Sequence, residues 1–204
     1  DIIDGGNGND ILNGRAGADR LDGGAGSDTA TYADWSMGRV LVNLNDGLVD
    51  VANNPMDTLV GVENAIGTVF NDIMIGSTGA NRLDGGAGDD WLFGYTGDDT
   101  IVGAAGADML VGSSGVDTLT GGSGGDTFVF WQAADSSAVA GSRDLIADFT
   151  RGQDMLDLVA IDANAGTGAN DAFRFLGSLA FDGQAGALRY AYNSGSNVTA
   201  LEGD

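Results

Sequence analysis

A nine-residue repeat dominates this sequence and restricts the folds open to it. Three copies run from Gly5 to Thr31, after a four-residue remnant, and seven more run from Gly67 to Val129. The first residue of every copy is Gly, and the fourth is Gly in all copies but one. The sixth residue is Asp in all copies but one, and the eighth is apolar in every copy. Units this short cannot bury a core alone, so the period predicts a stack of coils, a solenoid.

Each place in the repeat has a predicted role. Gly at the first and fourth places permits positive φ, so six residues form a turn. The last three residues form a short strand whose central side chain points inward. Two copies, eighteen residues, complete one coil of a parallel solenoid. We expect the eighth-place residues to stack as a ladder: Leu12, Leu21, Ala30, Met74, Leu83, Leu92, Ile101, Leu110, Leu119 and Phe128.

Aspartates eighteen residues apart should face each other on neighbouring coils. Two carboxylates about 4 Å apart repel by roughly 4 kcal/mol at an effective dielectric near 20, so a cation is needed between them. Calcium takes six to eight oxygen ligands, which two carboxylates and several backbone carbonyls supply. The candidate pairs are Asp1 with Asp19, Asp10 with Asp28, Asp72 with Asp90, Asp90 with Asp108, Asp99 with Asp117, Asp108 with Asp126 and, more weakly, Asn81 with Asp99.

The charge of the chain agrees with bound cations. Thirty acidic and eight basic residues leave a formal charge of −22, which disfavours nucleic acid or an anionic membrane as partners. Seven calcium ions would offset fourteen of these charges. Cys and His are absent from the sequence, which excludes disulfides, thiol nucleophiles, His-based catalysis and the usual zinc sites. The apolar stretches are too short to span a membrane.

The repeats resemble the GGxGxDxUx nonapeptide of the RTX, or hemolysin-type, calcium-binding family. A flexible Gly-rich linker, the bland alternative, would lack the fixed Asp and apolar places. The resemblance implies an all-β fold, a right-handed parallel β-roll, that folds in extracellular calcium on a protein exported by a type I secretion system. It also implies carbonyl ligands from turn glycines beside the aspartates: Gly6, Gly8, Gly23, Gly86, Gly88, Gly97, Gly103, Gly106, Gly112 and Gly121.

The repeat divides the chain into four expected regions. Residues 1–31 and 67–129 are the two repeat tracts. Residues 32–66, which alternate like strands, are expected to continue the coil irregularly without calcium, with a small separate hairpin as the alternative. Residues 130–204 are expected to form a C-terminal β-strand cap, with a core of Phe149, Phe173, Phe175, Phe181, Tyr190 and Tyr192.

Two departures from the repeat and one acidic residue beyond it affect the expected sites. Phe70 replaces a turn glycine and Asn81 replaces a ligand carboxylate, so we expect weak or empty sites there. Asp144, eighteen residues after Asp126, is a candidate additional ligand, with Asp148 or Asp154 nearby; a solvated acidic loop is the alternative.

The segments Asp144–Phe149, Gly152–Leu158 and 172–192 resemble the region that follows the roll in serralysin-type metalloproteases and other type I exported proteins. This resemblance implies an upstream domain of the same polypeptide and contact with the secretion apparatus through that parent chain. We expect the chain to be a secreted, monomeric piece that ends before any export signal.

Other chemistries fit the sequence less well. Adjacent acids such as Asp89 and Asp90, or Asp98 and Asp99, could be a glycosidase pair, but their repeat places favour calcium binding. Trp35, Trp91, Trp131 and Tyr95 could stack on sugars, although ordinary packing is the simpler interpretation.

We expect no catalytic residues here and three possible roles. The first is a calcium-folded stability module attached to a secreted enzyme, for which a serralysin-like zinc protease is the favoured parent. The second is a polysaccharide- or surface-binding module of an alginate epimerase or adhesin. The third is a structural spacer.

Overall fold

The computed structural model describes residues 1–52, 56–132, 134–136, 143–161, 174–175, 187–193 and 198–203. The described residues contain strands and turns without a helix, so none of them forms a helix that could cross a membrane. The chain divides into two compact units, Asp1–Asp157 and Leu158–Asp204. The all-β prediction is confirmed, and the first unit is a parallel β-roll.

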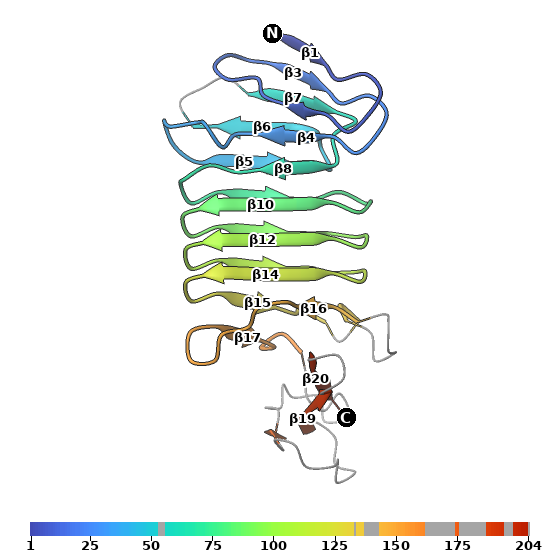
Figure 1. The fold of residues 1–204 in the computed structure, drawn as a ribbon, viewed down its shortest axis with the longest axis vertical. Coiled ribbons are helices and arrows are strands. Elements are labelled where there is room, and N and C mark those ends of the chain that lie inside the picture. The colour runs from blue at the N-terminus through green and yellow to red at the C-terminus, as the bar shows by residue number, and fades with distance from the viewer. Residues whose placement is uncertain are drawn as a thin grey trace. The chain divides into compact units, whose positions relative to one another are not determined.

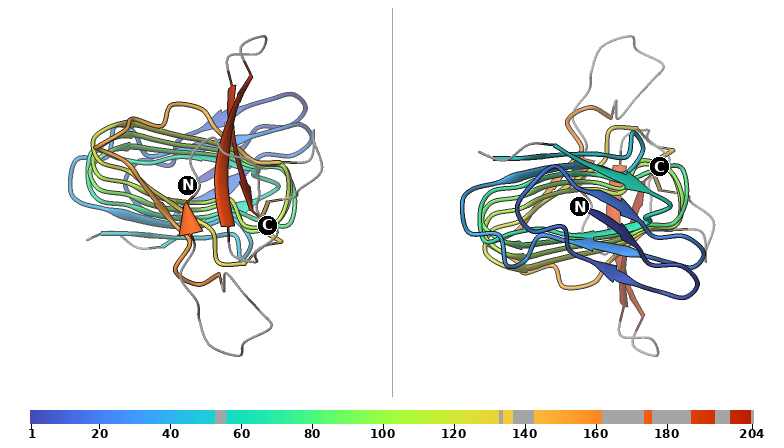
Figure 2. Two further views of the ribbon diagram at one scale, coloured as in Figure 1. Left: turned by 90° about the horizontal axis from the view of Figure 1, so that it is seen from below. Right: turned by 90° about the horizontal axis from the view of Figure 1, so that it is seen from above.

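Two sheets form the first unit, and they lie on opposite sides of a flattened coil (Figures 1 and 2). The longer sheet has the order β1 (Ile2–Asp4), β3 (Arg20–Asp22), β7 (Asp57–Val60), β6 (Leu48–Val51), β5 (Val40–Asn43), β9 (Ile73–Ile75), β11 (Trp91–Phe93), β13 (Met109–Val111), β15 (Thr127–Val129) and β17 (Met155–Asp157). The shorter sheet has the order β16 (Leu145–Ile146), β14 (Thr118–Ser123), β12 (Thr100–Ala105), β10 (Arg82–Ala87), β8 (Asn64–Ile66), β4 (Thr29–Thr31) and β2 (Ile11–Leu12).

The eighteen-residue coil is confirmed by the strand register. Successive repeats place their strands in alternate sheets, and strands of the same sheet pair in parallel with partners eighteen residues apart. Leu92, for example, lies opposite Leu110 between β11 and β13, and Leu83 lies opposite Ile101 between β10 and β12. Period-two alternation then sends the central residue of each strand inward.

The predicted apolar ladder is the core of the roll. All ten eighth-place side chains are buried, with exposures of 4% or less, and belong to one hydrophobic cluster. Residues of the 32–66 region extend this cluster: Tyr32, Trp35, Val40, Val42, Leu44, Val49, Val51, Leu59, Val62 and Ala65.

The 32–66 region stays within the coil, and a hairpin is built into its sheet. Strands β5 and β6 pair antiparallel, β6 also pairs antiparallel with β7, and these strands join the long sheet between β3 and β9. Strand β8 fills the matching place in the short sheet between β4 and β10. The hairpin explains why this region departs from the nine-residue register.

The coil continues past Val129, where the repeat ends. Strand β16 pairs with β14, and β17 pairs with β15, so both sheets gain one more strand. In the second unit, β18 (Arg174–Phe175) pairs in parallel with β19 (Ala187–Asn193), which pairs antiparallel with β20 (Val198–Gly203). Of the predicted cap aromatics, Phe149 contacts the Phe128 ring at a centroid distance of 6.0 Å. The positions of Phe173 and Phe181, and the side chains of Phe175, Tyr190 and Tyr192, lie outside the described residues.

Candidate metal centre

The sixth-place aspartates link neighbouring coils. Each lies where a turn meets its strand, and its Oδ1 accepts the backbone N–H of the residue eighteen positions earlier in all regular coils. Asp108 Oδ1 lies 2.8 Å from Asp90 N, and Asp126 Oδ1 lies 3.0 Å from Asp108 N. The same link joins Asp10 to Asp28, Asp72 to Asp90, Asn81 to Asp99 and Asp99 to Asp117, and the N-terminal ammonium group of Asp1 donates to Asp19 Oδ1. The structure therefore brings together every predicted pair, through a contact between a carboxylate and a main-chain nitrogen.

The second oxygen of most of these carboxylates is buried without a hydrogen-bond partner. Buried polar atoms in folded proteins nearly always have a partner, so each such oxygen indicates a site completed by another group. The atoms are Oδ2 of Asp10, Asp19, Asp28, Asp90, Asp99, Asp108, Asp117, Asp126 and Asp144.

The first-place glycines make room for these oxygens. A Cβ at Gly5 would lie 2.8 Å from both Asp10 Oδ2 and the Gly23 carbonyl oxygen. In tract 2, a Cβ at Gly85, Gly94 or Gly103 would overlap the carboxylate of its own repeat. The same three Cβ positions also lie close to a carbonyl oxygen of the next coil, that of Gly103, Gly112 or Gly121, at 3.0, 2.7 and 2.7 Å, respectively. Carboxylate and carbonyl oxygens thus converge where the sequence predicted shared ligands.

The prediction that glycine permits positive φ at the first and fourth places is confirmed at the fourth place, as at Gly8 (122°) and Gly88 (110°), and is wrong at the first. Positive φ also occurs at the second place, as at Gly6 (87°) and Gly86 (99°). The first place is glycine because the aspartate and the next coil occupy the space of a Cβ.

The fourth-place glycines stack so closely that their carbonyls point at the next coil. A Cβ at Gly26, Gly106, Gly115 or Gly124 would overlap the carbonyl oxygen of Gly8, Gly88, Gly97 or Gly106, respectively. The Gly6 carbonyl already accepts the Ala25 N–H at 2.8 Å. All the predicted glycine ligands therefore lie in stacked turns, where their backbone packs against neighbouring coils.

Burial makes the charged form of these carboxylates unfavourable. Desolvation, followed by the repulsion of nearby carboxylates, raises the pKa of Asp90 and of Asp99 to about 8. The same causes raise the pKa of Asp144 to about 7 and of Asp108 to about 6, and raise those of Asp117 and Asp126. A nearby cation would favour the ionised form instead.

The two departures from the repeat have a different arrangement. Neither Asp72 nor Asn81 carries a buried side-chain oxygen without a partner, because Thr68 and Ser77 donate to them. The expectation of weak or empty sites here stays a prediction, and this geometry supports it.

The acidic side chains after Val129 pair differently from the prediction. Asp144 was expected to follow Asp126 by the eighteen-residue rule, but its Oδ1 accepts the Asp117 N–H at 2.9 Å. Asp154 Oδ1 accepts the Asp126 N–H at 3.1 Å, and Asp148 accepts from the N–H groups of Gly121 and Gly122. Leu145 of β16 pairs with Thr118 of β14, twenty-seven residues earlier and not eighteen, and this longer step changes the partner of Asp144.

Sequence reasoning missed three acidic residues. Asp135 is 2% exposed, and its Oδ1 is buried without a partner. It lies nine residues after Asp126, so counting one more repeat would have found it. Asp57 and Glu63 accept the N–H groups of Asp19 and Asp28, respectively. Both lie in residues 32–66, the irregular region, where no nine-residue repeat indicates which acidic residues pair.

The turns suit a hard cation held largely by the backbone. Within the described ranges, no three acidic side chains lie close enough to hold a metal by themselves. Calcium would instead take one or two carboxylate oxygens with several turn carbonyls, the ligand types it prefers. Bound there, the ion would neutralise the buried charges.

The fold and these turns define a class, a parallel β-roll built from RTX-type turns. The RTX calcium-binding nonapeptide repeat (4 copies) matches residues 1–30, and the model described as Peptidase M10 serralysin C terminal matches residues 22–204. The chain belongs to this serralysin C-terminal family. RTX repeats bind calcium, both modules are non-catalytic, and both are typical of type I secreted extracellular proteins.

The other comparisons add little. A search of the curated proteins found no match. Among solved structures, the chain is similar to the AlgE6R3 subunit of the mannuronan C5-epimerase from Azotobacter vinelandii, at 33% identity and a TM-score of 0.28. That match covers 52% of this chain and 55% of the other.

Proposed function

We propose that this chain is the calcium-folded module of a type I secreted protein, which folds outside the cell and stabilises an attached domain. The observation that carries this proposal is the series of buried carboxylate oxygens without partners, repeated in coil after coil. Ions that bind the folded roll and not the unfolded chain stabilise it by about 2.7 kcal/mol per site at a hundred times the dissociation constant. Several such sites make folding switch-like.

The attached domain in this proposal is a serralysin-like zinc metalloprotease. Membership of the serralysin C-terminal family supports this parent. This chain has no His, so the protease's zinc-binding histidines would belong to another part of that polypeptide.

Circular dichroism of the chain in chelator, magnesium and calcium tests the folding proposal. We expect little β structure from the repeat tracts in chelator or magnesium and a cooperative gain on adding calcium. Magnesium fails because it demands near-ideal octahedral geometry and keeps its waters. Spectra that are the same in all three buffers would contradict the proposal.

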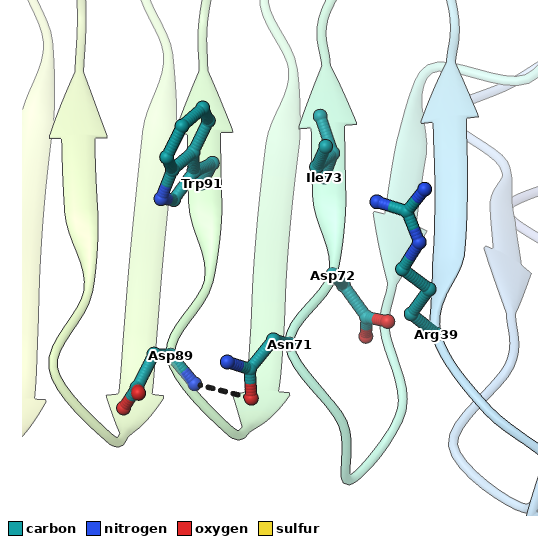
Figure 3. Close-up of a pocket in the computed structure, with 6 residues that line it drawn as sticks. All are labelled: Arg39, Asn71, Asp72, Ile73, Asp89 and Trp91. Atoms are coloured by element: carbon teal, nitrogen blue, oxygen red, sulfur yellow. Dashed lines mark hydrogen bonds between the residues drawn. The ribbon is translucent and has the colours of Figure 1, made fainter.

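A hollow on the outer face of the long sheet supports a second candidate function, saccharide binding. The hollow measures about 280 Å³ and is lined by Arg39, Asn71, Asp72, Ile73, Asp89 and Trp91 (Figure 3). Trp91 is 53% exposed and offers its flat indole for stacking, while Asn71 and Asp89 offer polar groups for hydroxyls. Arg39 would pair with a sugar carboxylate.

Titration of the calcium-loaded chain with uronate oligosaccharides tests this second candidate. Trp91→Ala should abolish saturable binding, whereas Tyr95→Ala, which removes another exposed aromatic, should leave it unchanged. If the unaltered chain shows no saturable binding, the hollow is not a saccharide site.

A further inference from the structure

Two kinds of turn occur in the roll, and they differ in how the sixth-place side chain is satisfied. In the first kind, represented by residues 85–90, Asp90 Oδ1 accepts one N–H and its Oδ2 is left without a partner. In the second kind, residues 67–72, Asp72 Oδ2 accepts the Thr68 N–H at 2.6 Å. Its Oδ1 accepts the Thr68 hydroxyl at 3.0 Å and the Val40 N–H at 2.7 Å. Both oxygens of Asp72 are therefore satisfied by the protein itself.

The next turn, residues 76–81, is satisfied in the same way without any charge. Asn81 Oδ1 accepts the Ser77 N–H at 2.6 Å and the Ser77 hydroxyl at 3.2 Å. Its amide group donates to the Glu63 carbonyl at 2.6 Å. An uncharged side chain with these partners leaves no oxygen that requires a cation.

A third self-satisfied side chain, a carboxylate, lies where tract 1 meets the irregular region. Asp57 is fully buried; its Oδ1 accepts the Asp19 N–H at 2.9 Å, and its Oδ2 accepts the Tyr32 hydroxyl at 3.2 Å. Tyr32 is 3% exposed, so this contact is shielded from water. The tyrosine hydroxyl gives Asp57 Oδ2 a hydrogen-bond partner, which the Oδ2 atoms of Asp10, Asp19 and Asp28 lack.

Backbone conformation separates the same two kinds of turn. The second place has positive φ at Arg15 (63°), Tyr95 (81°), Ala104 (77°) and Ser113 (68°), although none of these is glycine. A left-handed conformation costs a non-glycine residue on the order of 1 to 2 kcal/mol, so another interaction must hold it. Every one of these residues lies in a turn whose aspartate has an unpartnered oxygen. Thr68 and Ser77, at the same place, do not have positive φ.

We propose that the self-satisfied turns and the strands that support them, residues 57–81 together with Tyr32 and β5, form a calcium-independent joint. The joint folds without the ion and separates the calcium response into two groups of turns, one around Asp10, Asp19 and Asp28 and one from Asp90 to Asp126. This inference rests on the proposed function, because it assigns the ions to those two groups. The hydrophobic core that supports the joint includes Val40, Val42 and Leu59.

Hydrogen exchange measured by mass spectrometry on the whole chain tests the joint. In chelator, amides of β7, β8 and β9 should stay protected while those of β11, β12 and β13 exchange freely. Calcium should then protect the second set. If β7 to β9 exchange in chelator as fast as β11 to β13, the joint is overturned although calcium folding stands. If calcium protects neither set beyond its chelator level, the proposed function fails instead.

Two variants test the contacts themselves. Thr68→Val removes the hydroxyl at nearly constant shape, and Tyr32→Phe removes the phenol oxygen. Each should raise the exchange rate of the joint in chelator about fivefold, the equivalent of one hydrogen bond. Thr78→Val, at an exposed threonine in the neighbouring turn, is the matched control and should change nothing. Equal exchange in all three variants and the parent would overturn the assigned contacts.

Discussion

The irregular region and tract 2 build coils of the same roll by different means. Each strand of tract 2 buries its eighth-place side chain, and β13 and β15 bury Val111 and Val129 as well. From Asp90 to Asp126, every sixth-place aspartate has a carboxylate oxygen without a partner. In the irregular region, β5 and β6 each bury two apolar side chains on alternate positions: Val40 and Val42 in β5, and Val49 and Val51 in β6. Burial of apolar surface contributes about 25 cal/mol for each Å², so strands β5 and β6 gain more stability from the hydrophobic effect than a strand with one buried apolar side chain. The comparison teaches that coils of one roll can be stabilised to different degrees by the packing of apolar side chains.

Acidification in chelator should have the largest effect on this comparison. The raised pKa values of Asp90, Asp99 and Asp108 mean that the folded tract binds more protons than the unfolded chain. The stability from these carboxyls is fully present below about pH 4 and is lost as the pH rises through about 6 to 8. Lowering the pH from 8 to 5 in chelator should therefore restore structure around Trp91.

Fluorescence of single-tryptophan variants measures this effect. Trp91 reports on tract 2, whereas Trp35, which is 8% exposed, reports on the irregular region and should respond less. With calcium bound, the sign should reverse, because protons and calcium compete for the same oxygens. If the Trp91 signal in chelator does not depend on pH, protonation of the buried carboxylates does not stabilise tract 2, and this prediction is wrong.

Core truncation should have the next largest effect. Leu110 in tract 2 and Leu59 in the irregular region are both buried, with exposures of 0% and 6%. In calcium, Leu110→Ala and Leu59→Ala should each lower the free energy of unfolding by about 2 to 5 kcal/mol. In chelator, only Leu59→Ala should have an effect, because tract 2 is already unfolded. Urea titrations followed by circular dichroism in both buffers measure the difference, and equal losses in chelator would contradict it.

Glycine substitution should change the stability less than acidification or core truncation does, and its effect should differ between two sites. Gly106 and Gly79 share the fourth place of the repeat. Gly106 has a φ of 144°, and a Cβ there would overlap the Gly88 carbonyl oxygen. Gly79 lies in a self-satisfied turn without positive φ, and nothing lies within 4 Å of its Cβ position.

Gly106→Ala should therefore weaken calcium-dependent folding, whereas Gly79→Ala should be neutral or stabilise by less than about 1 kcal/mol. Calcium titrations followed by circular dichroism compare the two. If both variants shift the calcium midpoint equally, the two kinds of turn do not differ as described.

Much of the roll could be predicted because its repeat is strictly local. Nine-residue spacing determines which side chain of each strand points inward, and Leu92, Leu110 and Phe128 lie where that count places them. The eighteen-residue pairing of Asp90 with Asp108 follows from the same count. Asp144 shows where counting fails, because the longer chain after Val129 carries it to Asp117.

By itself, the sequence determined the period of the coil, its apolar ladder and the acidic character of its turns, because each depends on residue type at a regular spacing. Only the tertiary structure decided which carboxylates are satisfied. Asp57 meets Tyr32 across twenty-five residues and Asp72 meets Val40 across thirty-two. Such contacts arise from the hairpin that enters the long sheet, and no local pattern encodes how a strand pairs with a distant neighbour.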